Sequence, residues 1–231
     1  MDKLTRRIEN YWDERSSHFS KTRRLELDGV DGLAWENLFR KTLPDGRLKI
    51  LDVGTGAGFF AAILSRLGHE VTGVDMSQKM LVEAKKNLRE LKLSATFRKM
   101  NAQVLDFADE TFDVIVTRNL TWTLPDVKAA YREWQRVLKV GGVLINFDSD
   151  YGDQNFSACS RTKLVDGQLD ECTAIKDSLT ISRRRRPFWD AGFLEGLNFS
   201  VTLDEDISAV VQRDSRCRYD SVPLFAIFAT K

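Results

Sequence analysis

From residue 48 onward, short apolar runs alternate with longer segments in which apolar residues recur every three or four positions. The runs have the length of buried strands and stand at 48–53, 70–75, 95–100, 112–117 and 143–148. The longer segments, at 59–68, 77–91 and 126–142, have the pattern of amphipathic helices, the last of them ending at a pair of glycines. This alternation predicts an α/β fold in which helices cover both faces of a mainly parallel sheet.

The segments on either side of this pattern complete one domain, predicted to span residues 1–231. Residues 1–20 and 31–41 have helical periodicity and predict a helical cap over residues 1–42. After the fifth strand we expect a polar, substrate-side insertion at 149–186 and a short helix at 187–196. Two further strands, at 198–204 and 221–230, bring the predicted sheet to seven strands, and a long charged loop separates them.

The turn after the first strand contains glycines at alternate positions, in the stretch LDVGTGAGFF of residues 51–60. Sheets of this kind bind ligands at the carboxyl ends of their strands, and glycine lets the backbone approach a ligand closely. The nicotinamide fingerprint needs a third glycine where Phe59 stands, and a P-loop needs Lys and Ser or Thr after Gly58. Neither nucleotide motif is therefore complete.

Two carboxylates flank this turn at the ends of predicted strands. Asp52 precedes the first glycine; it would repel a pyrophosphate but can hold an ammonium group. Asp75 ends the second strand, where a carboxylate accepts hydrogen bonds from ribose hydroxyls. An ammonium, a ribose and no phosphate describe S-adenosylmethionine. The alternatives are that the acids only cap helices and that the glycines only form a tight turn.

The runs LDVGTGAG, VTGVDMS, FDVIVTRNL and RVLKVGG together resemble the class I S-adenosylmethionine-dependent methyltransferases, and most of all the small-molecule enzymes of the ubiquinone and menaquinone type. The resemblance implies a Rossmann-like three-layer sandwich whose last strand is antiparallel. It implies that the backbone of Gly54, Thr55 and Gly56 faces the methionine part of the cofactor. Asp52 would hold the cofactor's amino group and Asp75 its ribose.

The same resemblance assigns further residues. Met76 would pack on the adenine, with simple packing as the alternative. Asn101 and Ala102 stand where the family has an acidic residue and Ala at the adenine edge, so Asn101 is a departure from the pattern. Arg118 and Asn119 fall where the family lines the methyl-transfer site, although Asn119 could simply hold its loop.

Tyr11 belongs to the first predicted helix, which either anchors itself on the core or folds over the cofactor, placing this ring near the sulfonium. Methyl transfer itself is an in-line displacement that depends mainly on alignment. Where the acceptor needs a base, Asp148 and Asp150, just past the fifth strand, are candidates. The equally open alternative is that they are loop or capping residues.

The acceptor is an unidentified small molecule, which we expect to be anionic or aromatic. The RRRRP run at 183–187 is either a solvated turn or an anion site formed by residues among Arg183 to Arg186. Tyr151, Phe156 and Tyr219 suggest a partly aromatic pocket.

Composition narrows the classes of partner. The chain has 231 residues and a formal net charge of +1, which favours neither nucleic acid nor membrane as the main partner. Its 3 cysteines indicate no metal site. Without an apolar leader at its start, the chain is expected in the cytoplasm, as a monomer or homodimer. Two alternative functions remain: a non-catalytic S-adenosylmethionine-binding protein and, disfavoured by Phe59, a nicotinamide-dependent oxidoreductase.

Overall fold

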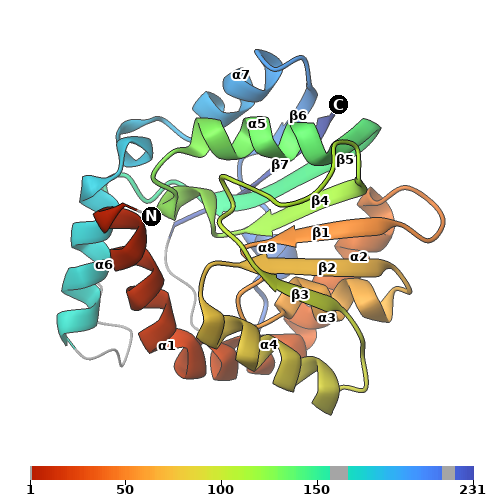
Figure 1. Cartoon of the computed structure of the whole chain (residues 1–231), viewed down its shortest axis with the longest axis horizontal. Coiled ribbons are helices and arrows are strands. Elements are labelled where there is room, and N and C mark those ends of the chain that lie inside the picture. The colour runs from red at the N-terminus through yellow and green to blue at the C-terminus, as the bar shows by residue number, and fades with distance from the viewer. Residues whose placement is uncertain (1, 157–165, 215–221) are drawn as a thin grey trace.

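The computed structural model describes residues 2–156, 166–214 and 222–231. A seven-stranded sheet forms its central layer, with the strand order β3-β2-β1-β4-β5-β7-β6 (Figure 1). Its strands are β1 (Lys49–Val53), β2 (Glu70–Asp75), β3 (Thr96–Lys99), β4 (Phe112–Arg118), β5 (Leu138–Ser149), β6 (Ser200–Asp204) and β7 (Leu224–Thr230). Strand β7 is antiparallel to both β5 and β6, and the pairs among β1 to β5 are parallel. The predicted fold class, including the antiparallel last strand, is confirmed.

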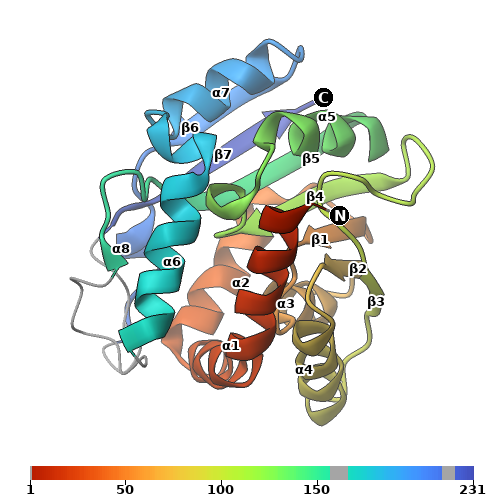
Figure 2. The same cartoon turned by 60° about the vertical axis from the view of Figure 1, so that its left-hand side comes forward.

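Helices cover this sheet on both faces. They are α1 (Lys3–Leu27), α2 (Val30–Thr42), α3 (Phe59–Arg66), α4 (Gln78–Glu90), α5 (Val127–Val137), α6 (Asp166–Ser178), α7 (Phe188–Glu195) and α8 (Ser208–Val211), with 3-10 turns η1 (Thr121–Thr123) and η3 (Thr180–Arg183). One apolar cluster surrounds Trp35, Phe39 and Phe60 of α2 and α3, and a second surrounds Tyr131 and Trp134 of α5. Helices α1 and α6 lie side by side at one end of the molecule (Figure 2).

The structure differs from the predicted elements at two helix ends. The predicted helix 126–142 is two elements, because α5 stops at Val137 and β5 begins at Leu138. The backbone of Gly141 and Gly142 bonds to Lys231 at the end of β7, so the sheet satisfies groups that a longer helix would have used. The first helix continues past residue 20 to Leu27.

Two helices lie where only loops were expected. Helix α6 occupies part of the insertion at 149–186, and the short α8 lies within the loop at 205–218. The rest of that insertion between 157 and 165, and Tyr219, lie outside the described residues. None of the helices in the described ranges is long and apolar enough to cross a membrane.

Candidate active site

The carboxyl ends of β1, β2 and β4 meet at one edge of the sheet, where the chain places β2 on one side of β1 and β4 on the other. Such a reversal of strand order opens a crevice for ligands in α/β sheets. The predicted cofactor residues stand near the carboxyl ends of these strands and of β3, or in the turns that follow them. The fold therefore brings the glycine turn, Asp75 and Asn119 to a single region.

Gly54, Gly56 and Gly58 have φ angles of 69°, 52° and 83°, in the left-handed region that favours glycine. The turn is held by the carbonyl oxygen of Val74, which accepts from the backbone N–H of Gly54 at 2.9 Å and of Thr55 at 3.0 Å. A Cβ atom at Gly54 would lie 2.8 Å from the Leu120 methyl groups, and one at Gly56 would lie 3.2 Å from Phe19. These glycines are thus required both by the turn's conformation and by close approach.

Asp52 is 2% exposed and serves the turn itself. Its Oδ2 accepts from Thr55 Oγ1 at 2.6 Å and from the backbone N–H of Ala61, in the first turn of α3, at 3.1 Å. Burial raises the pKa of the Asp52 carboxyl to about 7, although those two hydrogen bonds oppose the rise. The role predicted for Asp52, holding the cofactor's amino group, stays a prediction, and the contacts show a second role in fixing the glycine turn.

Asp75 lies between the glycine turn and the start of α4. One carboxylate oxygen accepts from the backbone N–H of Gly56 at 2.9 Å, and the other from that of Ser77 at 2.8 Å. Burial raises the pKa of the Asp75 carboxyl to about 6, and the nearby carboxylate of Asp13 in α1 adds to the rise. Each carboxylate oxygen has a second lone pair, so Asp75 retains capacity for ribose hydroxyls.

The residues assigned to the adenine lie on the next turns. Met76 packs against the larger apolar cluster, and Ala102 is 9% exposed. The side-chain oxygen of Asn101 accepts from the backbone N–H of Gln103 at 2.9 Å, which ties it to its own turn. The carbonyl oxygen of Ala102 accepts from the indole N–H of Trp134 at 2.9 Å, so α5 fixes this turn.

Arg118 and Asn119, adjacent in the chain, make different contacts. The guanidinium of Arg118 pairs with buried Glu26 at 2.8 Å and lies 4.8 Å from the centroid of the Trp35 ring. These contacts join Arg118 to the helical cap. Asn119 has a φ of 51°, and its buried side-chain oxygen has no hydrogen-bond partner among the described residues. A buried, unpaired amide oxygen at a strand end is where a ligand donor would be expected.

Helix α1 covers the glycine turn. Phe19 lies 3.2 Å from the position where a Cβ of Gly56 would stand, and Asp13 accepts from the Ser77 hydroxyl and from the backbone N–H of Lys79. Tyr11 is 5% exposed and accepts a hydrogen bond from Arg15, and burial raises the pKa of its hydroxyl. The lid over the cofactor and the part played by Tyr11 both stay predictions.

Asp148 is fully buried in an ionic network that the sequence did not predict. Its carboxylate pairs with Arg186 at 3.4 Å and accepts from Thr121 and from the backbone N–H of Trp122. Burial raises the pKa of Asp148, whereas Arg186 lowers it. These contacts favour the structural alternative for Asp148 over a role as general base.

Arg186 is the buried member of the arginine run. Its side chain is 2% exposed and pairs with Asp190 at 2.8 Å, and Asp190 also accepts from the Tyr131 hydroxyl at 2.7 Å. Burial lowers the pKa of Arg186, but the carboxylates of Asp190 and Asp148 raise it above its ordinary value. Arg183, Arg184 and Arg185 are exposed, as a solvated turn requires. The run alone could not reveal which arginine is buried.

Aromatic rings gather beside this network. Trp122 and Tyr151 meet edge to face with centroids 5.1 Å apart, and Phe156 lies 5.4 Å from Tyr151. Trp12 of α1 lies 6.5 Å from Trp122, so the aromatic cluster reaches the covering helix. A small hollow is lined by Trp122, Asp150, Tyr151, Gly152, Ile181, Ser182 and Arg186.

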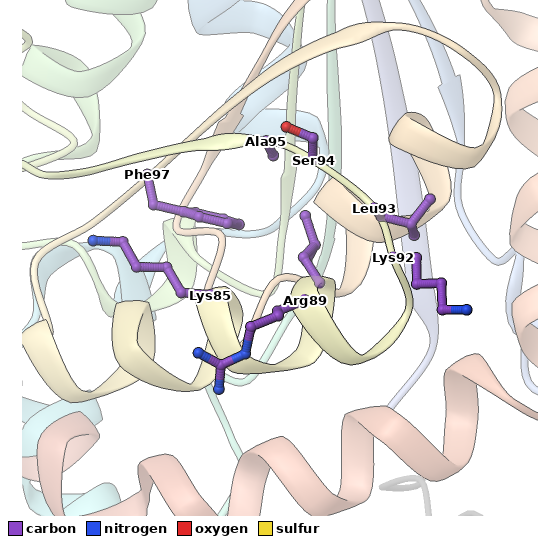
Figure 3. A pocket seen from close by; sticks show the side chains of 8 residues that line it. Lys85, Arg89, Lys92, Leu93, Ser94, Ala95 and Phe97 are labelled. Atoms are coloured by element: carbon purple, nitrogen blue, oxygen red, sulfur yellow. The ribbon is translucent and has the colours of Figure 1, made fainter.

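A larger hollow, of about 380 Å³, lies away from these residues, between α4 and β3 (Figure 3). Lys85, Arg89 and Lys92 surround an apolar floor that includes Phe97. Leu88 is shared between this hollow and the packing around Gly58. None of the residues predicted for the cofactor or for catalysis lines this hollow.

Comparison with known proteins identifies similar chains. Residues 51–146 match the family described as a methyltransferase domain. The phosphatidylethanolamine N-methyltransferase of Cereibacter sphaeroides is 37% identical over 109 residues, covering 45% of this chain and 53% of the relative. The ubiquinone biosynthesis O-methyltransferase of Alkalilimnicola ehrlichii is 35% identical over 102 residues, covering 44% of this chain and 41% of the relative. Aligned residues thus span about half of each relative's length.

The fold has counterparts among solved structures. The structure of a SAM dependent methyltransferase from Aquifex aeolicus aligns with a TM-score of 0.62 at 20% identity, over 94% of this chain and 97% of that one. At this identity the likeness establishes the fold.

Proposed function

We propose that this chain, whose residues 51–146 match a methyltransferase domain, transfers a methyl group from S-adenosylmethionine to a small molecule. The resemblance predicted from the sequence is confirmed at the level of the family, and the cofactor is the one expected for that family. The activity and the acceptor are our proposals.

One observation carries the proposal: a glycine turn in the left-handed region whose Gly56 N–H is bound by Asp75, at the switch point of the sheet. This arrangement offers a backbone without side chains and a carboxylate, and the glycine turn contains no phosphate-binding lysine. The side-chain oxygen of Asn119, which has no hydrogen-bond partner in the described part of the chain, adds an acceptor beside this turn. The residues present therefore suit a nucleoside that carries an amino acid.

Different residues of the site would bind different parts of the cofactor. The backbone of Gly54, Thr55 and Gly56 would bind the methionine part, and Asp75 the ribose hydroxyls. Met76, Asn101 and Ala102 would surround the adenine. The bound cofactor supplies an activated methyl group, so the protein's task is to align the acceptor and exclude water. Trp12, Trp122 and their aromatic neighbours would exclude water from that position.

The buried network around Asp148 bears on how the methyl acceptor loses its proton. Asp148 is fully buried and its Oδ2 is already bound by Arg186 and Thr121, so we infer that an acceptor does not reach it. We infer an acceptor that enters as an anion or that loses its proton to water. The aromatic residues around Trp122 and Tyr151 support an acceptor that is itself aromatic or apolar.

Substitution of Asp75 tests the proposed site. We expect Asp75→Ala to weaken S-adenosylmethionine binding at least tenfold by calorimetry, about 1.4 kcal/mol, because hydroxyl hydrogen bonds to a carboxylate contribute about 1.5–3 kcal/mol. Asp45→Ala, which removes an exposed carboxylate in the loop before β1, is the matched control and should bind as the unaltered protein does.

Equal affinity in all three proteins would contradict the assignment of the cofactor site. Release of S-adenosylhomocysteine with an aromatic or apolar acceptor would support catalysis. Tight binding with no methyl transfer to a broad acceptor panel would instead favour the non-catalytic alternative.

A further inference from the structure

Helices α5 and α7 lie side by side on one flank of the molecule and share a stack of aromatic rings (Figures 1 and 2). Trp189 and Phe193 of α7 stack with centroids 5.6 Å apart and an interplanar angle of 11°. Phe193 stacks in turn on Tyr131 of α5, with centroids 6.1 Å apart. Phe188, at the start of α7, is 41% exposed and is the one aromatic ring among the exposed large apolar side chains of the described residues.

Cations from both helices surround these rings. Lys128 and Arg132, one turn apart on α5, lie 5.8 Å and 5.4 Å from the Phe193 centroid. From the segment before α7, Arg184 lies 5.8 Å from the Trp189 ring and Arg185 lies 4.8 Å from the Phe188 ring. We call this surface the aromatic-basic face; its outer residues are Lys128, Arg132, Arg184, Arg185, Phe188 and Trp189.

The charges of this face are not neutralised locally. Within the described part of the chain, none of its four cations forms an ion pair with a carboxylate. Arg186, next in the chain, is by contrast buried and paired with Asp190. The net charge of +1 therefore conceals a positive region on one flank.

We propose that the aromatic-basic face docks on the surface of an anionic phospholipid membrane. Tryptophan and phenylalanine rings partition into the interface between headgroups and acyl chains, and neighbouring Lys and Arg attract anionic lipids. The combination of an exposed Phe188 with four unneutralised cations matches both features. This inference goes beyond the proposed methyl transfer and does not depend on it.

The face also adjoins the aromatic hollow. Ile181, Ser182 and Arg186, in or next to the segment that carries the exposed arginines, line that hollow together with Trp122 and Tyr151. A face seated on a membrane would therefore hold the hollow close to the lipid headgroups. Nucleic acid is the less favoured partner, because the formal net charge of the chain is only +1.

Vesicle sedimentation of the full chain tests the proposal. The protein should bind mixed phosphatidylcholine–phosphatidylglycerol vesicles, bind pure phosphatidylcholine vesicles much more weakly, and dissociate at about 1 M NaCl, where charges are screened beyond about 3 Å. The double variant Arg184→Gln/Arg185→Gln should bind about thirtyfold more weakly, since each basic residue near an anionic surface contributes about fivefold.

The control is Lys85→Gln/Arg89→Gln, which removes the same charge from exposed positions on α4 at the larger hollow (Figure 3). It should change vesicle binding less than threefold. Equal losses in the two double variants, or equal binding to neutral and anionic vesicles, would overturn the proposal. So would tighter binding to a single-stranded oligonucleotide that only the face variant loses. Vesicle composition and salt test the unaltered protein even if a variant fails to fold.

Discussion

At the scale of single residues, the buried carboxylates of the glycine turn make stability depend on pH. Burial raises the pKa of Asp52 from its ordinary 3.8 to about 7. Between these values the folded chain binds a proton that the unfolded chain releases, so the free energy of unfolding falls as pH rises from about 4 to about 7.

Asp52→Asn removes this titration. We expect the free energy of unfolding of the variant, relative to that of the unaltered protein, to rise from about pH 4 to about pH 7 and then to level off. The total change should be on the order of 2–4 kcal/mol, at about 1.4 kcal/mol per pKa unit. Urea unfolding at pH values across this range measures it. Parallel stability curves for the two proteins would contradict the interpretation.

Single-residue roles were predictable where the backbone alone determines them. The positions of Gly54 and Gly56 in the turn, and of Asp75 at a strand end, follow from the pattern of strands. The direction of the Arg118 side chain could not be predicted. Its ion-pair partner is Glu26, in a helix whose position no local sequence pattern specifies. The partner of Asp148 is likewise 38 positions away, in the arginine run.

At the scale of elements, α1 determines access to the glycine turn. Phe19 lies 3.2 Å from the position where a Cβ of Gly56 would stand, so we expect a cofactor that reaches this backbone to displace the ring. We expect Phe19→Ala to increase the association rate of S-adenosylmethionine several-fold, as measured by stopped-flow mixing, because the smaller side chain leaves the turn open.

Phe107→Ala provides the control, since Phe107 is also partly buried but packs on Phe112, away from the turn. Its association rate should match that of the unaltered protein. If the two variants bound the cofactor equally fast, α1 would not limit access.

Element ends were harder to predict than the elements themselves. The pattern from 126 to 142 is helical throughout, yet β5 takes over at Leu138 because Leu138 pairs with Phe112 of β4. Helix α6 was missed because its segment is polar and shows no clear apolar stripe. In both regions tertiary contacts determine the secondary structure more than the local sequence pattern does.

At the scale of the whole molecule, Arg186 joins three parts of the fold. It contacts Asp148 of β5, Asp190 of α7 and Thr121 of η1. We expect Arg186→Met to lower the free energy of unfolding by about 3–5 kcal/mol, because it leaves two buried carboxylates without their cation. Chemical denaturation measures the change.

Arg185→Met is the matched control one position earlier, where the side chain is exposed and lies over Phe188. Its free energy of unfolding should fall by no more than about 1 kcal/mol. Similar losses in the two variants would mean that the buried network contributes no more than a surface contact does.

The overall architecture was predictable because the alternation of strands and helices is strong between residues 48 and 148. The aromatic-basic face was not, since net charge averages over the whole surface. Trp189 lies one helical turn from Phe193 within α7, but Lys128 and Tyr131 become neighbours of Phe193 only when α7 packs beside α5.

The ion pair between Glu26 and Arg118 restricts how the first helix can swing. Glu26 lies near the carboxyl end of α1, is fully buried, and also binds Arg23 at 2.6 Å and the indole of Trp35 at 3.2 Å. Moving this carboxylate into solvent would break its ion pair with Arg118, so we expect that end of α1 to stay in place when the helix moves. We expect the amino-terminal half of α1 to move away from the core instead. A protease should therefore cleave that half before it cleaves the carboxyl-terminal end of the helix.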